Sequence, residues 1–197
     1  INNIKRLVKN SKHKVMVVDD SVVFRKQMKD MLENLFFKVV TVAHGEEAIN
    51  LLNSTNDEIS MVLTDYNMPV MNGLELTEQI RKTYKKNELS VIALSGKSDD
   101  EEIALFLKNG ANDFIKKPFS KEEFSCRINN SIEALENIQE ITNQAIRDFL
   151  TGLYNRRYFF KEASKYFSSA VQSGENFAIA MIDIDHFKKI NDTYGHD

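Results

Sequence analysis

The stretch "ISMVLTDYNMPVMNGLEL", residues 59–76, joins a short apolar run to an aspartate, a turn and an amphipathic segment. Apolar residues dominate positions 59–64, which is typical of a buried strand, and Asp65 follows directly. Asn72 and Gly73 then open a segment in which apolar residues recur at helical spacing. The stretch therefore predicts a strand, a turn and a helix, with a carboxylate where the strand ends.

The same unit recurs over roughly residues 13–125. Amphipathic segments of helical spacing separate five short apolar runs: "KVMVV" (14–18), "FKVVTV" (37–42), "ISMVLT" (59–64), "LSVIAL" (89–94) and "NDFIK" (112–116). Gly110, in "KNGAND", lies where a helix would end. Strict alternation of strand and helix predicts a parallel sheet covered by helices on both faces. The expected fold class is therefore α/β, with an open, doubly wound, five-stranded parallel sheet.

Polar residues follow four of the predicted strands. Asp19 and Asp20 follow the first, Asp65 the third, Ser95 the fourth and Lys117 the fifth. In such sheets ligands bind outside the carboxyl ends of the strands, so these side chains are expected to meet at one edge. Carboxylates gathered there need a counter-cation, most simply Mg²⁺. Such a metal suits phosphoryl transfer, because it neutralises phosphate oxygens while a carboxylate attacks phosphorus.

Each of these residues also has a purely structural explanation. Asp20 and Ser21 could cap the helix that follows. Ser95 could belong to a turn with Gly96, and Lys117 could be an ordinary surface lysine. Only the joint placement of these side chains after successive strands favours a functional site.

Four blocks resemble the signature blocks of bacterial response-regulator receiver domains of the CheY-like type: "VVDDS", "VLTDYNMPVMNGLEL", "ALSGK" and "FIKKPF". They occur in the order and at the spacing of that family. The resemblance implies a flavodoxin-like fold and a role in two-component signalling. It implies that Asp65 is the phosphoacceptor, taking phosphate from a histidine kinase, a phosphotransfer protein or a small-molecule donor.

The resemblance also implies a metal site and a switch. Asp20, Asp65 and the backbone carbonyl of Asn67 would bind Mg²⁺, with Asp19 contributing through water. Three further positions match residues that respond to phosphate: Ser95 and Phe114 would reorient, and Lys117 would contact the phosphate. The bond between Lys117 and Pro118 is expected to be cis, a conformation that only a residue before proline adopts at low cost.

Residues 120–150 contain no glycine or proline and are expected to form one long helix, with residues 126–147 as a connector between two domains. Two interleaved sets of residues recur at a spacing of seven: Ile128, Leu135 and Thr142, with Ser131, Ile138 and Ala145. This pattern fits a weak coiled coil with polar seam positions. It fits equally well a helix whose first half packs on the preceding domain and whose second half is a solvated connector.

Residues 148–197 resemble the opening of the GGDEF family of diguanylate cyclases, which join two GTP molecules into cyclic di-GMP. "DFLTGLYNRRYFFKEA" and "FAIAMIDIDHFKKINDTYGHD" carry this resemblance. The run "FAIAMI", residues 177–182, is expected to be a buried strand of an α+β domain. Asp183 at its end would then be well placed to hold a metal over a triphosphate.

For this segment the resemblance implies a nucleotide site. Asp183 and the carbonyl of Ile184 would bind metal. Four residues would contact GTP, two through nearby amides (His186, Phe187) and two through side chains (Lys188 on phosphates, Asn191 on the guanine). Asp185 has no implied catalytic role and is expected to cap a helix.

The GG(D/E)EF hairpin of the family would lie beyond Asp197, so the parent protein is expected to be a cyclase and this chain to be inactive as one. The alternative is a non-enzymatic, phosphorylation-dependent interaction switch with a degenerate nucleotide-binding output domain. Because catalysis joins two GTP molecules, a phosphorylation-dependent homodimer is expected. DNA is not an expected partner, since no basic recognition helix follows the receiver.

Composition adds modest constraints. The 197 residues carry a formal net charge of −3 and one cysteine, Cys126, which suits a reducing cytoplasm. No apolar run or signal peptide predicts contact with a membrane. Residues 1–12 form a basic arm, expected to be a solvated linker or the tail of an upstream helix rather than a phosphate- or lipid-binding element. A first residue of Ile suggests an interior piece of a longer protein.

Overall fold

The computed structural model describes residues 2–54, 58–96 and 100–195, and it divides the chain into two units. The first unit comprises residues 1–143 and the second unit residues 144–197. Within the described residues, no helix is both long enough and apolar enough to span a bilayer.

The first unit is built on a parallel sheet whose strand order is β2-β1-β3-β4-β5. The strands are β1 (Lys14–Val18), β2 (Lys38–Val42), β3 (Ile59–Asp65), β4 (Ser90–Ser95) and β5 (Asp113–Lys116). All four neighbouring pairs are parallel, and β2 and β5 are the edges. The expected flavodoxin-like α/β fold is confirmed, and each predicted strand end lies within one residue of the observed one.

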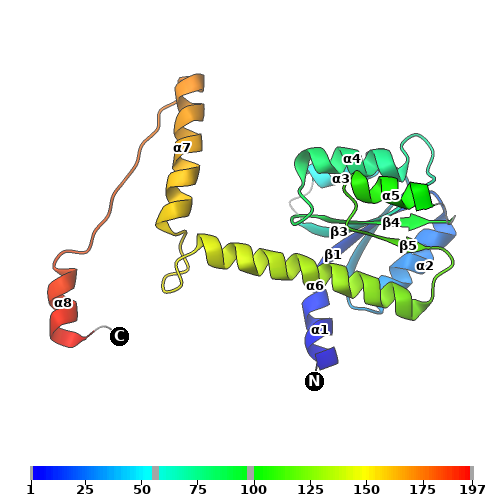
Figure 1. Cartoon of the computed structure of the whole chain (residues 1–197), viewed down its shortest axis with the longest axis horizontal. Helices are drawn as coiled ribbons and strands as arrows, with labels where there is room; N and C mark the ends of the chain where they lie inside the picture. Colours follow the sequence, from blue (N-terminus) through cyan, green and yellow to red (C-terminus); the bar gives the residue numbers. More distant parts are fainter. Residues whose placement is uncertain (1, 55–57, 97–99, 196–197) are drawn as a thin grey trace. The chain divides into compact units, whose positions relative to one another are not determined.

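Helices cover both faces of the sheet (Figure 1). On one face lie α2 (Val22–Glu33) and the first part of α6 (Lys121–Ile146), and on the other lie α3 (Gly45–Ser54), α4 (Gly73–Thr83) and α5 (Asp100–Lys108). Alternate residues along a strand pack against opposite helix layers. In β1, Val15 and Val17 pack with α2 and α6, whereas Met16 and Val18 pack with α3 and α4. The central strands are buried on both faces, as near-continuous apolar runs predict.

Local signals explain where several helices begin and end. The side chain of Ser21 accepts a hydrogen bond from the amide of Phe24, which caps α2. Asn72 and Glu75 form a reciprocal capping box at the start of α4. Gly110 follows α5 with a φ of 109°, a conformation that glycine adopts readily. At these three positions the helix starts and stops follow the residue types predicted for them.

The basic N-terminal residues form a helix, α1 (Asn2–Asn10), that is attached to the first unit. The side-chain nitrogen of Asn10, Nδ2, donates to the carbonyl of Leu35 at 2.9 Å and to Oδ1 of Asn129 at 3.1 Å. Lys9 Nζ lies 3.1 Å from Glu136 Oε2. This segment is therefore more ordered than a solvated linker, because its end is tied to α6.

The long helix α6 has a buried first half and an exposed second half. Phe124, Ile128, Ile132 and Leu135 are buried, whereas Ile141 is 65% exposed. Oγ of Ser131 lies 2.7 Å from Oγ of Ser90. The first half of α6 therefore packs on its own sheet, in agreement with the second of the two explanations of the heptad pattern. The buried Leu135 is not free to form a seam with another helix.

The second unit contains α7 (Arg156–Ser173) and α8 (Phe187–Tyr194), connected by an extended segment. The expected buried strand at 177–182 is not found: these residues form no ladder, and Met181 is 96% exposed. A strand needs a neighbouring strand to satisfy its N–H and C=O groups. No such neighbour lies beside these residues in the described part of the second unit, so the apolar run stays extended and solvated.

Candidate functional site

Charged side chains from three strand ends meet at the carboxyl edge of the first unit's sheet. Nζ of Lys117, after β5, lies 2.7 Å from Oδ1 of Asp65 at the end of β3. The same ammonium lies 3.4 Å from Oδ2 of Asp19, which follows β1. Because β1, β3 and β5 are parallel strands of one sheet, their carboxyl ends lie at the same edge and bring together residues that are far apart in sequence. One ammonium thus sits between two carboxylates at the point where the topology predicts a ligand site.

Asp19 is the buried member of this cluster, 2% exposed. Its Oδ1 accepts a hydrogen bond from the amide of Ser21 at 2.8 Å, and its carbonyl accepts one from Arg25 Nη1 at 2.6 Å. Burial raises the pKa of Asp19, and the charge of Asp65 adds to this, while the Ser21 amide and Lys117 oppose it. The net rise in pKa means that the folded protein disfavours the ionised form, so the site draws positive charge toward Asp19.

The ammonium of Lys117 is also held from its other side. It lies 3.7 Å from the centroid of the Phe24 ring in α2. The amide of Lys117 donates to the carbonyl of Ser95 at 2.7 Å, which fixes the residue beside the end of β4. The Lys117–Pro118 bond is cis, as the resemblance implied. The backbone hydrogen bond to Ser95 and the contact with the Phe24 ring together position the Lys117 ammonium beside the two carboxylates.

Asp65 is within reach of solvent because the chain after it turns away sharply. Its side chain is 15% exposed. A Cβ on Gly73 would lie 2.1 Å from the carbonyl oxygen of Asp65, so only glycine fits there. The amide of Gly73 donates to the carbonyl of Tyr66 at 3.0 Å. The predicted turn therefore starts α4 against the end of β3 and leaves the Asp65 carboxylate open to a ligand.

The other predicted site residues of the first unit differ in exposure. Asp20 and Asn67 are exposed, and Ser95 is buried at the end of β4. Phe114 is half-buried and packs against Ala93, Phe106 and Ala111. The structure thus brings Asp19, Asp65 and Lys117 together, while the side chain of Asp20 faces solvent instead of completing a trio of carboxylates.

The donor atoms at this edge fit a hard cation that keeps much of its water. Two carboxylates share one ammonium here, so the site already accommodates positive charge. Across the described ranges, no three Asp, Glu, His or Cys side chains are grouped closely enough to hold a metal ion by themselves. Mg²⁺ commonly binds through one or two carboxylates plus water, so Asp19 and Asp65 suit it with further oxygens from nearby backbone.

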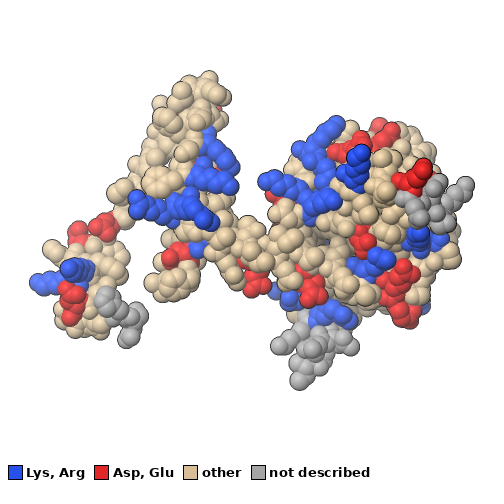
Figure 2. Space-filling model, viewed as in Figure 1, with Lys and Arg blue, Asp and Glu red and all other residues tan. Residues whose placement is uncertain are grey.

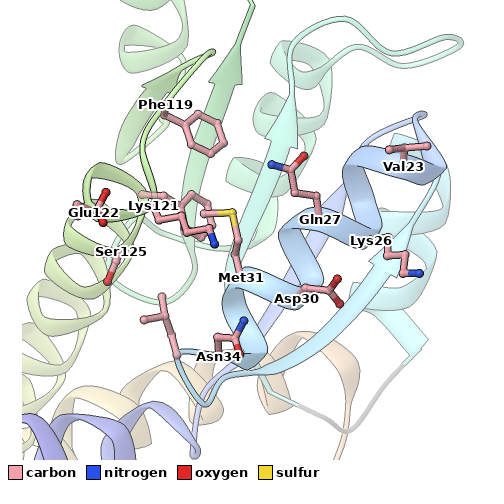
Figure 3. A pocket seen from close by; sticks show the side chains of 12 residues that line it. Val23, Lys26, Gln27, Asp30, Met31, Asn34, Phe119, Lys121, Glu122 and Ser125 are labelled. Carbon is pink, nitrogen blue, oxygen red and sulfur yellow. The ribbon is translucent and has the colours of Figure 1, made fainter.

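A groove lies between α2 and the start of α6 (Figure 3). It encloses about 690 Å³, and its walls include Met31, Phe119 and Phe124 with Lys26 and Glu122 at the rim. Figure 3 shows side chains of α2 and of the segment around Phe119 facing one another across it. The ring of Phe119 packs edge-on against the Phe24 ring, with centroids 6.4 Å apart, so ring contacts join the groove to the acidic site.

Charges of both signs are mixed over the visible face of the first unit (Figure 2). Lys and Arg side chains alternate there with Asp and Glu, and no wide surface of one sign is seen on that face. Long-range attraction of a polyanion needs such a surface. The visible face therefore offers no surface of one sign that would attract a polyanion, and the cluster of Asp19, Asp65 and Lys117 is a local arrangement of charge.

The predicted nucleotide residues of the second unit are not assembled into a pocket. Asp183, Ile184 and Lys188 are exposed, and Oδ1 of Asp183 accepts a hydrogen bond from the amide of Ile184 at 2.9 Å. Three further residues lie at the start of α8 or within it: His186, Phe187 and Asn191. The prediction that Asp185 caps this helix is wrong. The N-cap is His186, in the left-handed region with no side-chain bond, because the chain turns there between Ile184 and Phe187.

Several residues that shape the first site were missed by sequence reasoning. Phe24 supports Lys117, Arg25 binds the carbonyl of Asp19, and Arg127 bonds to Asp113 beside Phe114. The spacing offered one usable signal: Phe24 and Arg25 lie in the first turn of the helix that follows Asp20, so they had to lie near the strand end. Arg127 gave no such signal, because its contacts depend on where α6 meets β5.

Comparisons with known proteins agree with this architecture. Residues 15–129, more than half of the chain, match the response regulator receiver domain family, and residues 145–197 match the diguanylate cyclase GGDEF domain family. The response regulator PleD of Caulobacter vibrioides is 30% identical over 151 residues, which are 73% of this chain and 33% of PleD. The chain therefore spans about a third of the length of that relative.

Other relatives match the first unit. A CheY homolog of Campylobacter jejuni, a chemotaxis protein, is 37% identical over 110 residues, 55% of this chain and 84% of that protein. A solved structure described as a probable two-component system response regulator/GGDEF domain protein has a TM-score of 0.65 and 36% identity, covering 68% of this chain and 55% of the other. The BeF3-activated DrrB receiver domain has a TM-score of 0.54 and 30% identity, covering 61% and 97%. The chain belongs to the response regulator family, with a receiver domain followed by the N-terminal part of a GGDEF domain.

Proposed function

We propose that Asp65 accepts a phosphoryl group and that the protein is a phosphorylation-controlled regulator of a diguanylate cyclase domain. The observation that carries this proposal is the ammonium of Lys117 between Asp65 and Asp19 at the carboxyl edge of the sheet. The cluster offers a reachable carboxylate nucleophile, a fixed positive charge and oxygen donors for a cation. Phosphoryl transfer to a carboxylate needs these three components.

In this reaction an oxygen of Asp65 attacks phosphorus in a phosphohistidine or an acyl phosphate. A phosphorus–oxygen bond forms, the bond from phosphorus to the donor breaks, and its electron pair leaves with the donor. Lys117 moves from the carboxylate to the new phosphate oxygens. Asp20, Asp65 and the carbonyl of Asn67 would hold Mg²⁺, with Asp19 contributing through water, and the bound cation would neutralise charge on the phosphate oxygens.

Substitution of Asp65 tests this assignment. Wild-type protein treated with acetyl phosphate and Mg²⁺ should gain one phosphoryl group by mass spectrometry, and Asp65→Asn should gain none. Asp30→Asn is a matched control, because Asp30 is an exposed aspartate of α2 away from the strand ends. Full modification of the Asp65→Asn protein, or none of the wild type, would contradict the assignment.

We infer that a protein donor contacts the groove between α2 and α6. The groove combines apolar side chains such as Met31 and Phe119 with charged ones such as Lys26, and ring contacts of Phe119 and Phe24 connect it to Lys117. Met31→Glu would place a charge in that wall. It should slow transfer from a phosphorylated histidine kinase or phosphotransfer protein while leaving modification by acetyl phosphate unchanged. Equal slowing with both donors would mean that the substitution acts on the site itself.

We further propose that the second unit is the regulated output. In the longer protein Asp183 and the Ile184 carbonyl would bind metal. The GTP phosphates would be bound by amides near His186 and Phe187 and by the side chain of Lys188. Asn191 would bind guanine. An extended protein should make cyclic di-GMP from GTP, and Asp183→Ala should abolish this without changing Asp65 phosphorylation. The 197-residue chain should make none. An extended protein that stays silent in both phosphorylation states would favour the non-enzymatic switch.

Because the cyclase reaction joins two GTP molecules and each domain binds one of them, dimerisation of the protein is a natural way to control activity. We propose that phosphate on Asp65 draws Ser95 toward it, lets Phe114 turn inward and promotes a homodimer. Light scattering should show an increase in mass when beryllofluoride is added. Leu135 is buried and would disturb the fold if replaced, so Ile138→Glu with Ile141→Glu is the sharper test of helix pairing. An unmodified chain that is already a tight dimer, unchanged by beryllofluoride, would contradict this control.

A further inference from the structure

Arg127 of α6 contacts two consecutive residues of β5. Its Nη1 lies 3.0 Å from each carboxylate oxygen of Asp113. Its guanidinium carbon lies 5.4 Å from the centroid of the Phe114 ring. A weaker pair within α6 links Nε of Arg127 to Glu123 at 3.6 Å. One arginine thus joins the long helix to the aromatic residue that the proposed function assigns to the switch.

The position of β5 makes this contact possible. Ile115 packs with the layer of α2 and α6, whereas Phe114, its neighbour, packs with Phe106 and Ala93 on the opposite face. A side chain of α6 can reach a ring on that far face only around a sheet edge, and β5 is an edge strand. Arg127 therefore bridges the two layers at the strand that also leads to Lys117.

The ion pair with Asp113 fixes where the guanidinium lies. Oδ1 of Asp113 also accepts a hydrogen bond from the amide of Phe114 at 2.8 Å, so this carboxylate is tied to the backbone of the ring-bearing residue. The hydrogen bond to Asp113 raises the pKa of Arg127, although burial opposes this. The charge is thus held close to the ring, where the electron-rich face attracts a cation.

We propose that Arg127 is a positioning residue that couples the orientation of the Phe114 ring to α6. The coupling rests on the proposed function, in which Phe114 turns when Asp65 is phosphorylated. In the described state the ring and the guanidinium stabilise each other. When the ring turns inward, Arg127 loses that contact and keeps only its carboxylate partners on β5 and α6. The contact therefore favours the described orientation of the ring, and its loss would loosen α6 when the switch operates.

This coupling predicts the size and sign of an effect on ligand binding. A partly exposed cation–π contact changes a two-state equilibrium by about two- to fivefold. A ligand that binds one state gains apparent affinity in proportion to the population of that state. Removal of the guanidinium should therefore tighten binding of beryllofluoride by about two- to fivefold. A surface ion pair with no link to the switch would leave that affinity unchanged.

The test is a double-mutant cycle on full-length chain titrated with beryllofluoride in Mg²⁺. Arg127→Gln should tighten binding in the wild-type background and have no effect in a Phe114→Leu background, which lacks the ring face. Lys121→Gln, which removes an exposed cation from the same helix, should leave beryllofluoride binding unchanged in both backgrounds. Hydrogen exchange of residues 121–135 should rise with beryllofluoride in the wild type and show no further rise in Arg127→Gln.

The outcomes separate the coupling from the function on which it rests. An equal effect of Arg127→Gln in both backgrounds, or weaker binding, would overturn the coupling alone. Beryllofluoride that binds the Asp65→Asn protein as tightly as the wild type would overturn the proposed phosphoacceptor, and the coupling with it. Tighter binding by Arg127→Gln only when Phe114 is present would establish the link.

Discussion

Phe124 in the first unit is fully buried, whereas Phe149 in the second unit is 99% exposed. The contrast extends to whole elements. Among described residues, Ala170 is the only hydrophobic side chain of the second unit that is buried. The first unit contains one core cluster on the face of α2 and α6 and two on the face of α3, α4 and α5. Large aromatic residues such as Phe159 and Phe167 lie on the surface of α7. Similar side chains therefore have different surroundings in the two units.

The difference separates structure that forms locally from structure that needs distant partners. Helix α7 forms with Asn155 as its N-cap and Gly174 as its left-handed C-cap, although its apolar face is open. The run at 177–182 has the composition of a buried strand but forms none. Helix hydrogen bonds lie within a segment, whereas strand hydrogen bonds need a neighbour. Whether a helix forms therefore depends mainly on the local sequence, whereas whether a strand forms depends on the rest of the fold.

The sharpest way to test this comparison is the same substitution in both units. Phe124→Ala should lower the free energy of unfolding of the first unit by about 3–5 kcal/mol, because it removes a fully buried ring and leaves a cavity. Phe167→Ala, at a ring that is 56% exposed and packs edge-on against the Phe177 ring at 5.8 Å, should cost only about 0.5–1.5 kcal/mol. Hydrogen exchange measured on separate peptides reports each unit by itself. Similar losses at the two sites would mean that α7 packs in solution against a surface absent from the described contacts.

Much of the first unit could be predicted because its signals are local and repeated. The five apolar runs became the five strands, and the strand-end rule brought Asp19, Asp65 and Lys117 to one edge. The rule names strand ends only, so it could not predict that Phe24 would support the ammonium or that Asp20 would face solvent. The strand at 177–182 was predicted wrongly for a related reason, since an apolar pattern carries no information on whether a partner strand is beside it.

A smaller effect is expected from Asn10, which attaches α1 to the first unit. Its side chain is buried and donates to the Leu35 carbonyl and to Asn129. Asn10→Ala leaves one buried and one partly buried acceptor without this donor and should cost about 1–3 kcal/mol in unfolding free energy. Asn155→Ala removes the cap of α7 and should cost about 1 kcal/mol in that helix alone. Protection of residues 6–13 that survives Asn10→Ala would show that α1 is held by other contacts.

Substitution of Asp19 should raise the free energy of unfolding, by less than the substitution of Asn10 lowers it. Burial raises the pKa of Asp19, so the folded state binds more protons than the unfolded state at pH values just above the ordinary value of 3.8. Stability therefore falls as pH rises through that range, and the ionised form remains unfavourable at neutral pH. Asp19→Asn should raise the urea midpoint at pH 7 and weaken Mg²⁺-dependent beryllofluoride binding. Asp183→Asn, at an exposed aspartate of the second unit, is the matched control and should leave the midpoint unchanged.

The smallest expected effect concerns Glu136, where α6 meets α1 and β1. Burial alone would raise the pKa of Glu136, but hydrogen bonds from His13 at 3.2 Å and Lys9 at 3.1 Å outweigh it, so the pKa is lowered. A lowered pKa adds stability that is fully present above the ordinary value of 4.5 and is lost as pH falls through the folded-state value.

Because the Glu136 carboxylate is partly exposed, that contribution should stay below about 1 kcal/mol. Glu136→Gln should remove it, so the difference in unfolding free energy between wild type and variant should be largest near neutral pH and vanish in acid. The pair of Glu162 and Lys165 in α7 joins a partly exposed carboxylate to an exposed lysine of the same helix, and Glu162→Gln should leave the pH dependence of the first unit unchanged. A difference at Glu136 that is constant from neutral to acid pH would mean that packing, rather than charge, holds α6 against α1. In that case the contrast between the units would rest on apolar burial alone.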